Sequence, residues 1–263
     1  MSFFNRSFYR PGPGIDKDAP RKKGISRFLE ICSRDFLDLV KLNLLFCMCC
    51  LPSAALFAFS LFGFEGEGSF ILFLLSIVCA FPVGGAMSAC FFCITRRMRD
   101  DPSFIWFDFK RKFKENYVYA IPAGIFCTVV FYAQFYLIMI VSGTGGAGIE
   151  AWMLFVNLII LILLGMIVPY FFLLLPYFHL SPSQLLRNSM IMFAINTPRS
   201  FMGSVQGGLI WALYAFLYPF SIFLSPFIIL VAFSMSWLLT LMWIWKPVNE
   251  KFKIEEALSR RQG

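Results

Sequence analysis

Four cysteines have the spacing of a metal site. Cys47 and Cys50 form one Cys-x-x-Cys pair, and Cys90 and Cys93 form another. Two such pairs could supply the four thiolates of a structural zinc site. However, the first pair falls well inside an apolar stretch and the second pair ends another one, so we expect the pairs at different depths. Cysteine also serves as a small apolar residue. We therefore predict no metal and no cofactor.

Residues that could catalyse a reaction are sparse. His179 is the only histidine, and neither a carboxylate nor a cysteine stands beside it, which is more typical of an interfacial residue than of a catalyst. The sequence contains no glycine-rich phosphate loop, no zinc-protease pair of histidines and no nucleophile elbow. We expect no catalytic residues and predict that the protein is not an enzyme.

The composition indicates a membrane protein. Hydrophobic residues make up 59% of the chain and charged residues 14%, whereas about a quarter of a soluble domain is charged. A helix needs roughly 20 apolar residues to cross a bilayer, and six stretches meet this length: 37–62, 69–94, 117–141, 151–178, 203–221 and 223–245. The predicted fold is an all-α, polytopic bundle of six transmembrane helices, within a membrane domain of residues 25–246.

The basic residues predict the orientation of the bundle. Of the 23 lysines and arginines, eight precede residue 36, seven lie between Arg96 and Lys114, and five follow residue 245. By the positive-inside rule, these segments and both termini are cytoplasmic. Residues 1–24 are expected to form a disordered basic tail, and residues 247–263 a second cytoplasmic tail. The net charge of +8 follows from this topology, so we expect no nucleic acid partner.

Small side chains recur at helical spacing in the second predicted span. After Pro82, which we expect to kink the helix, they form one strip: Gly85, Ala86, Ala89, Cys90 and Cys93. Such a strip lets another helix approach closely. We expect its partner to be the first span, which has small residues of its own: Cys47, Cys50, Ala54 and Ala58.

Two amides stand out within the predicted spans. Gln134 lies near the outer end of the third span, and Asn157 lies near the outer end of the fourth. We predict an interhelical hydrogen bond between them, worth on the order of 1 kcal/mol; a shared polar site for a solute is the alternative. The central parts of the spans contain no Asp, Glu, Arg or His, which counts against ion-coupled transport.

Two cytoplasmic amphipathic helices are predicted from proline-containing N-terminal signals. Asp101-Pro102 and Ser181-Pro182 each place a capping residue before a proline, and Gln184 completes a capping box in the second. The helix after Asp101 puts four apolar residues on one face: Ile105, Trp106, Phe109 and Phe113. Its other face is charged: Lys110, Arg111, Lys114 and Glu115.

Two further aromatics, Phe104 and Phe107, project away from the predicted buried face of this helix. Exposed aromatics beside basic residues are typical of protein interaction sites. The first amphipathic helix is therefore the candidate docking element for a partner. The alternative is that its apolar face only rests on lipid headgroups, with its bases attracted to anionic lipid.

The sequence resembles the YesL-like family of bacterial membrane proteins, which contain a domain of unknown function. The resemblance covers roughly residues 25–250. It rests mainly on the second span and the loop after it: Pro82, Gly85, Ala86, Ala89, Phe104, Phe107, Phe109, Phe113, Lys114 and Asn116. The first span adds Lys41, Leu42, Asn43 and Pro52, and a later loop adds Asn196 and Pro198. The long basic N-terminal tail and the high cysteine count depart from the usual pattern of the family.

The resemblance implies a role rather than a reaction. Members of the family are commonly encoded beside carbohydrate-uptake ABC transporters, chiefly in Gram-positive bacteria. It therefore implies a non-enzymatic accessory or regulatory subunit of such a transporter in a bacterial plasma membrane, with membrane lipids and transporter subunits as partners. The alternative is a self-sufficient passive channel or facilitator for a solute, with Gln134 and Asn157 along its route.

Overall fold

The computed structural model describes residues 22–63, 66–101, 103–143, 149–178, 180–217 and 225–262. All regular structure in these ranges is helical, so the predicted all-α class is confirmed. The helices are α1 (Gly24–Arg34), α2 (Phe36–Phe62), α3 (Glu67–Val78), α4 (Phe81–Met98), α5 (Ile105–Gly143), α6 (Ile149–Leu174), α7 (Pro182–Ile195), α8 (Thr197–Leu217), α9 (Ser225–Phe252) and α10 (Ile254–Gln262). Residues 1–21 of the predicted tail and His179 lie outside the described ranges.

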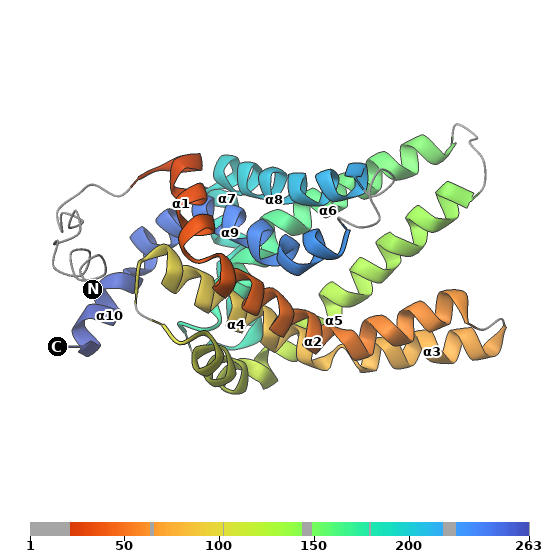
Figure 1. Ribbon diagram of the computed structural model, residues 1–263, viewed down its shortest axis with the longest axis horizontal. Coiled ribbons are helices and arrows are strands. Elements are labelled where there is room, and N and C mark those ends of the chain that lie inside the picture. Colours follow the sequence, from red (N-terminus) through yellow and green to blue (C-terminus); the bar gives the residue numbers. More distant parts are fainter. Residues whose placement is uncertain are drawn as a thin grey trace, which may run out of the picture.

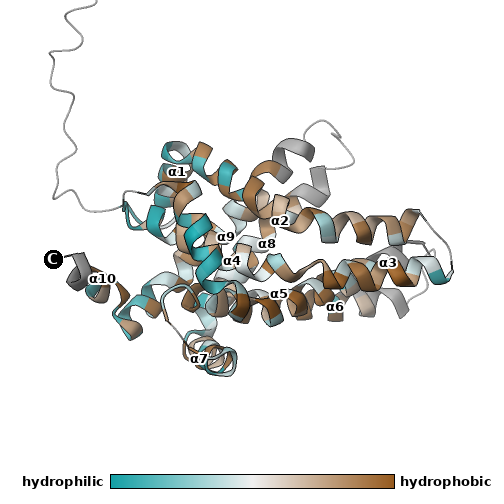
Figure 2. Ribbon diagram, turned by 90° about the horizontal axis from the view of Figure 1, so that it is seen from below, coloured by the Kyte–Doolittle hydropathy of each residue, from teal (hydrophilic) through white to brown (hydrophobic). Residues whose placement is uncertain are grey.

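The described helices include five membrane-crossing candidates: Phe36–Phe62, Glu67–Met98, Ile105–Leu137, Phe155–Leu174 and Leu230–Phe252. These apolar helices indicate a multi-pass membrane protein in contact with lipid. The remaining predicted span, residues 203–221, falls on α8 and extends beyond it. Figure 2 shows apolar residues along α2, α3, α5 and α6, and a concentration of hydrophilic residues at the end where α1 lies.

The second predicted span is interrupted. α3 ends at Val78 and α4 begins at Phe81, because Pro82 has no amide hydrogen to continue the helical hydrogen bonds. The Ser53 hydroxyl donates to the Ser76 carbonyl at 2.7 Å, which satisfies a backbone acceptor close to the break. The Tyr132 hydroxyl lies 2.6 Å from the same Ser53 oxygen. The predicted kink is thus a full break, and α2, α3 and α5 meet beside it.

The first predicted cytoplasmic helix is not a separate element. α5 is one continuous helix of 39 residues, and it contains both the amphipathic segment and the third predicted span. It begins at Ile105 with a bond from the Asp108 amide to the Phe104 carbonyl at 2.9 Å, so Asp101 does not cap it. A separate helix does follow the second signal: α7 begins at Pro182, and Ser181 and Gln184 form the predicted capping box.

α4 lies at the centre of the bundle and contacts α2, α5, α6 and α9. It packs most extensively on α5, where the two backbones touch: a Cβ atom at Gly84 would overlap the Ala120 carbonyl, and one at Gly124 would overlap the Gly84 backbone. In Figure 1, α1 and α10 lie at the same end of the bundle, and the α2–α3 and α5–α6 hairpins extend toward the other end.

The predicted small-residue strip is buried, but part of its partner was misassigned. Ala86, Ala89, Cys90 and Cys93 are fully buried. Gly85, however, faces the Phe113 ring and the Tyr117 backbone of α5, not α2. On α2, Ala54 and Ala58 are exposed; the buried side instead consists of larger and polar residues, among them Leu39, Leu42, Asn43, Phe46, Ser53 and Phe57. Spacing alone did not reveal which small residues face a neighbouring helix.

Candidate functional site

Three arginines at the end of α4 reach three different neighbours. The Arg96 guanidinium lies 2.7 Å from the Asp108 carboxylate of α5. Arg97 lies 2.6 Å from Asp38 of α2. Arg99 pairs with Asp101 at 2.7 Å. Basic groups are favourable here because the carbonyl end of a helix carries partial negative charge. The last turn of α4 is therefore the polar joint of the bundle.

Arg99 also links α4 to the far side of this joint through aromatic rings. Its guanidinium lies 5.3 Å from the ring centroid of Trp245 in α9 and 5.9 Å from that of Tyr177, which follows α6. Such contacts are attractive because the ring face carries negative charge density. The Tyr177 hydroxyl in turn lies 2.6 Å from Thr95 of α4.

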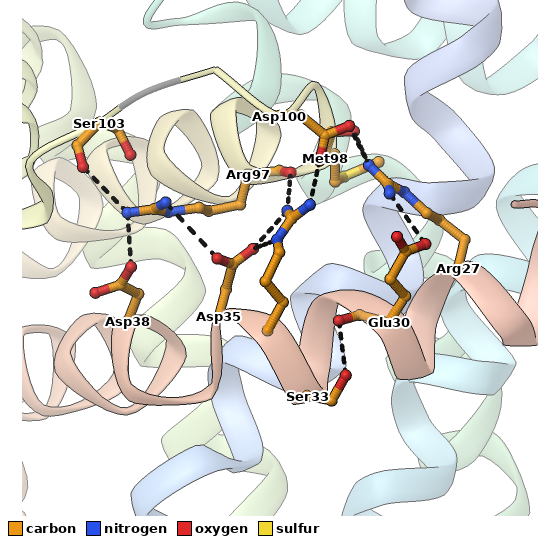
Figure 3. Close-up of polar contacts among 10 residues, drawn as sticks. Arg27, Glu30, Ser33, Asp35, Asp38, Arg97, Met98, Asp100 and Ser103 are labelled. Atoms are coloured by element: carbon orange, nitrogen blue, oxygen red, sulfur yellow. Dashed lines mark hydrogen bonds and ion pairs between the residues drawn. The ribbon is translucent and has the colours of Figure 1, made fainter. Parts of the chain in front are cut away.

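Asp100 joins α1 to the same turn (Figure 3). Its carboxylate oxygens accept from Arg34 at 2.5 Å and from Arg27 at 2.6 Å. Arg27 also donates to the Met98 carbonyl at 3.1 Å, and Arg34 donates to the Arg97 carbonyl at 3.3 Å. These bonds add side-chain donors to carbonyls in the last turn of α4, where the regular helical hydrogen bonds end. The backbone of Asp100 is left-handed, with φ of 64°.

The charges in this joint shift the pKa values of both partners. Burial raises the pKa of Asp100, but the hydrogen bonds and charges of Arg34 and Arg27 outweigh burial and hold the pKa below its usual value. For Arg34, the hydrogen bond to Asp35 is the main cause that raises its pKa, and burial opposes it. Nearby in α1, burial raises the pKa of the Cys32 thiol to about 11, so this thiol is protonated at neutral pH.

The first turns of α5 expose aromatic side chains. Phe104, Trp106 and Phe107 are 85%, 65% and 63% exposed, whereas Ile105 and Phe109 are 5% and 6% exposed. The predicted orientation is therefore correct for Phe104, Phe107, Ile105 and Phe109 but wrong for Trp106. Phe104, Trp106 and Phe107 are called the aromatic ridge below.

The other residues proposed for docking lie as follows. Lys110 and Lys114 are exposed, and Phe113 is half-buried against α4. Asp108 is buried between Arg96 and Arg111, with its second oxygen 3.0 Å from Arg111. Asp108 thus ties one side of this segment to α4. The aromatic ridge thus belongs to a helix segment that is attached to the bundle through a buried ion pair.

The predicted hydrogen bond between Gln134 and Asn157 is absent. The two residues lie on α5 and α6, which contact each other, and are 9% and 3% exposed. Neither Oε1 of Gln134 nor Oδ1 of Asn157 has a hydrogen-bond partner. Buried acceptors without a partner are costly and rare, so these two oxygens are candidates for contact with a solute or a water molecule.

Asn43 is also a buried amide, but its side-chain oxygen, unlike those of Gln134 and Asn157, has hydrogen-bond partners. Its Oδ1 accepts from the backbone amides of Phe233 and Ser234 in α9, at 3.0 Å and 3.2 Å. It therefore has a structural role, namely to join α2 to α9. From the sequence, Asn43 was named only among the residues of the family resemblance, and this partner could not be assigned, because Phe233 is 190 residues away along the chain.

The cysteine pairs lie in different surroundings. Cys90 and Cys93 are fully buried in α4, and Cys47 and Cys50 are half-buried in α2. The Cys90 thiol contacts the Leu42 carbonyl at 3.7 Å, as expected of a packing residue. Within the described ranges, no group of three or more His, Cys, Asp or Glu side chains could hold a metal ion.

Sequence reasoning missed the joint around Asp100 because its members are scattered over the first hundred residues. A usable signal was present, since acidic residues stand beside the basic ones: Asp35 and Asp38 at the start of the first span, and Asp100 and Asp101 after the second. Antiparallel neighbouring helices bring such segments to one end of a bundle. Comparison of the chain with models of protein families, with curated proteins and with solved structures finds no match.

Proposed function

We propose that this protein is a non-enzymatic accessory or regulatory subunit of a membrane transport system, and that it docks on its partner through the aromatic ridge. The observation that carries the proposal is the contrast between exposed Phe104, Trp106 and Phe107 and buried Ile105 and Phe109 on neighbouring positions. Large exposed aromatics on a rigid element are the usual anchors of protein interfaces. The resemblance to YesL-like proteins supports an ABC-type carbohydrate transporter as the partner.

The proposed topology has six spans with both termini in the cytoplasm. The end of α6 and the end of α9 meet where Tyr177 contacts Trp245, with ring centroids 6.0 Å apart. Between these points α8 runs antiparallel to α9, with Gly203 against Thr240 and Trp211 against Phe233. α8 therefore leads away from the polar end as α9 returns to it, which supports α8 as the sixth span.

The topology is tested with single cysteines in a background without the native ones. A cysteine at Gly66, at the α2–α3 turn, should react with an impermeant thiol reagent added to intact cells. A cysteine at Lys110 should react only after the membrane is opened. Labelling of position 110 by the reagent outside intact cells would show that the orientation is the opposite of the proposed one.

The docking proposal is tested by combining Phe104→Ala, Trp106→Ala and Phe107→Ala. This variant should be inserted and folded normally but should lose stoichiometric co-purification of transporter subunits in mild detergent. The matched control is Leu186→Ala with Met190→Ala on α7, where both side chains are also exposed; it should keep the partner. Phe109→Ala should instead lower the folded yield, because Phe109 is buried.

A photoreactive amino acid at position 107 separates protein docking from simple contact with lipid. Crosslinks to a transporter subunit, absent from the same probe at position 186, would support docking. Crosslinks to lipid alone would overturn it and leave the ridge as a membrane-surface element.

A second candidate function is a passive route for a small solute. The unpartnered amide oxygens of Gln134 and Asn157 favour it, because the hydroxyl groups of a solute could donate hydrogen bonds to them. Solute flux through the purified protein in liposomes, lost on Gln134→Leu, would favour this route over the accessory role. No flux above that of empty liposomes would exclude it.

A further inference from the structure

A groove opens on the surface where α4 begins beside α5. It has a volume of about 300 Å³ and is lined by Phe81, Phe113, Lys114 and Tyr117. The Tyr117 ring contacts the other two: the Phe81 and Phe113 centroids lie 6.1 Å and 5.4 Å from that of Tyr117. Phe113 rests on the backbone of Gly85, where a Cβ would stand 3.2 Å from the ring. The lining is therefore aromatic apart from one ammonium group.

The groove lies at the boundary between the polar and apolar parts of α5. The last charged residues of this helix are Lys114 and Glu115, and no charged residue occurs from Asn116 to Gly143. Lysine and tyrosine are the residues typical of the membrane interface, where an apolar stem lies in hydrocarbon and a polar tip reaches the headgroups. Lys114 is thus at phosphate depth, and the rings extend from it toward the acyl chains.

Two lysines on this side of α5 are not neutralised by an acidic side chain among the described residues. Lys110 lies one turn before Lys114, so the two ammonium groups share a face. Nearby acidic groups are engaged elsewhere: Glu115 pairs with Lys112 at 2.7 Å, and Asp108 pairs with Arg96 and Arg111. Among the described residues, neither Lys110 nor Lys114 forms an ion pair. The groove therefore attracts an anion.

We propose that this groove binds one anionic phospholipid. The phosphate lies at Lys114, with Lys110 as a second contact, and the upper acyl chain lies over the rings of Phe81, Phe113 and Tyr117. An amphiphile fits this groove because the groove has its single cation, Lys114, at one end and an apolar surface that continues from there. A soluble anion would use the lysines but gain nothing from the rings. The site is independent of the aromatic ridge and of any transporter partner.

The test is native mass spectrometry of the full chain in detergent, titrated with phosphatidylglycerol and with phosphatidylcholine of the same acyl chains. The wild type should retain phosphatidylglycerol preferentially. Lys114→Gln should weaken that binding about fivefold, the factor that corresponds to about 1 kcal/mol for one basic group near anionic lipid. Lys114→Arg should preserve it. Lys246→Gln is the matched control, since Lys246 is an exposed lysine at the polar end of α9; it should bind as the wild type does.

Phe81→Ala provides the second arm, because Phe81 is partly exposed and contacts the groove from α4. It should weaken binding of long-chain phosphatidylglycerol while leaving the preference over phosphatidylcholine intact. Inorganic phosphate in excess should not displace the lipid. Equal phosphatidylglycerol binding by Lys114→Gln and Lys246→Gln, or displacement by phosphate, would each overturn the proposal.

Discussion

The Arg96 guanidinium lies 2.7 Å from the buried carboxylate of Asp108, and this ion pair fastens the first turn of α5 to the last turn of α4. Both charges are favourably placed with respect to their helices, since acids suit the beginning of a helix and bases suit its end. Asp108 lies on the buried side of the helix with Ile105 and Phe109, whereas Phe107 lies on the exposed side. The ion pair therefore joins α4 to the side of α5 that does not carry Phe107.

Loss of this buried carboxylate should destabilise the protein strongly. Asp108→Asn removes the negative charge that faces Arg96 and Arg111, and breaking a buried pair from one side costs about 3–5 kcal/mol. Thermal unfolding in detergent should show a large fall in midpoint. Glu115→Gln is the matched control, because its pair with Lys112 is more exposed and should contribute no more than about 1 kcal/mol. Similar midpoints for the two variants would contradict the assignment.

The link between α1 and α4 should be lost in acid. The folded-state pKa of Asp100 lies below its usual 3.8, so the carboxylate stabilises the fold above that value. This contribution disappears as the pH falls through the folded-state pKa. Asp100→Asn should therefore unfold at a lower temperature than the wild type at pH 7, and the difference should shrink below about pH 4.

Asparagine is suited to this test because it tolerates the left-handed backbone at position 100, so the change removes charge without adding strain. Asp101→Asn is the control, since Asp101 pairs with Arg99 of its own loop and not with α1. A difference between Asp100→Asn and wild type that persists unchanged at low pH would show that charge is not its cause.

A methyl group at Gly84 should separate α4 from α5. The new Cβ would overlap the Ala120 carbonyl, which is backbone and cannot rotate away. Gly84→Ala should therefore lower the folded yield and the unfolding temperature. Gly85→Ala should do less harm, because it meets a side-chain ring at 3.2 Å.

Gly208→Ala is the matched control for this experiment. Gly208 is also helical, but nothing lies within 4 Å of a Cβ placed there. Alanine is favoured over glycine in a helix by about 1 kcal/mol, so this variant should be neutral or more stable. Equal damage from Gly84→Ala and Gly208→Ala would disprove the close approach of α4 and α5.

Removal of the unpartnered amides should not destabilise the bundle. Gln134→Leu and Asn157→Leu each eliminate a buried acceptor that lacks a partner, whose burial costs about 1–3 kcal/mol. We expect unfolding midpoints equal to or above that of the wild type. Asn43→Leu should be clearly destabilising, because it leaves the Phe233 and Ser234 amides without their Asn43 acceptor. A loss of stability for Gln134→Leu equal to that for Asn43→Leu would indicate a structural role.

The sequence by itself determined the features that depend on neighbours along the chain. Apolar stretches of spanning length appear as helices, because a helix satisfies its backbone hydrogen bonds within its own segment, as a lipid environment requires. The break at Pro82 and the capping box of Ser181 and Gln184 are equally local. Exposure of Phe104 and Phe107 followed from helical periodicity alone.

Only the tertiary structure decided which groups meet across the bundle. Periodicity placed Trp106 on the buried face, but the residues that α5 buries here are Ile105, Asp108 and Phe109, and Trp106 is exposed. Gly85 could have faced either neighbour, and it faces α5. Gln134 and Asn157 lie on contacting helices without bonding. Each outcome depends on the relative rotation of two helices, which is set by the sum of many packing contacts and is not encoded in the spacing of residues within one helix.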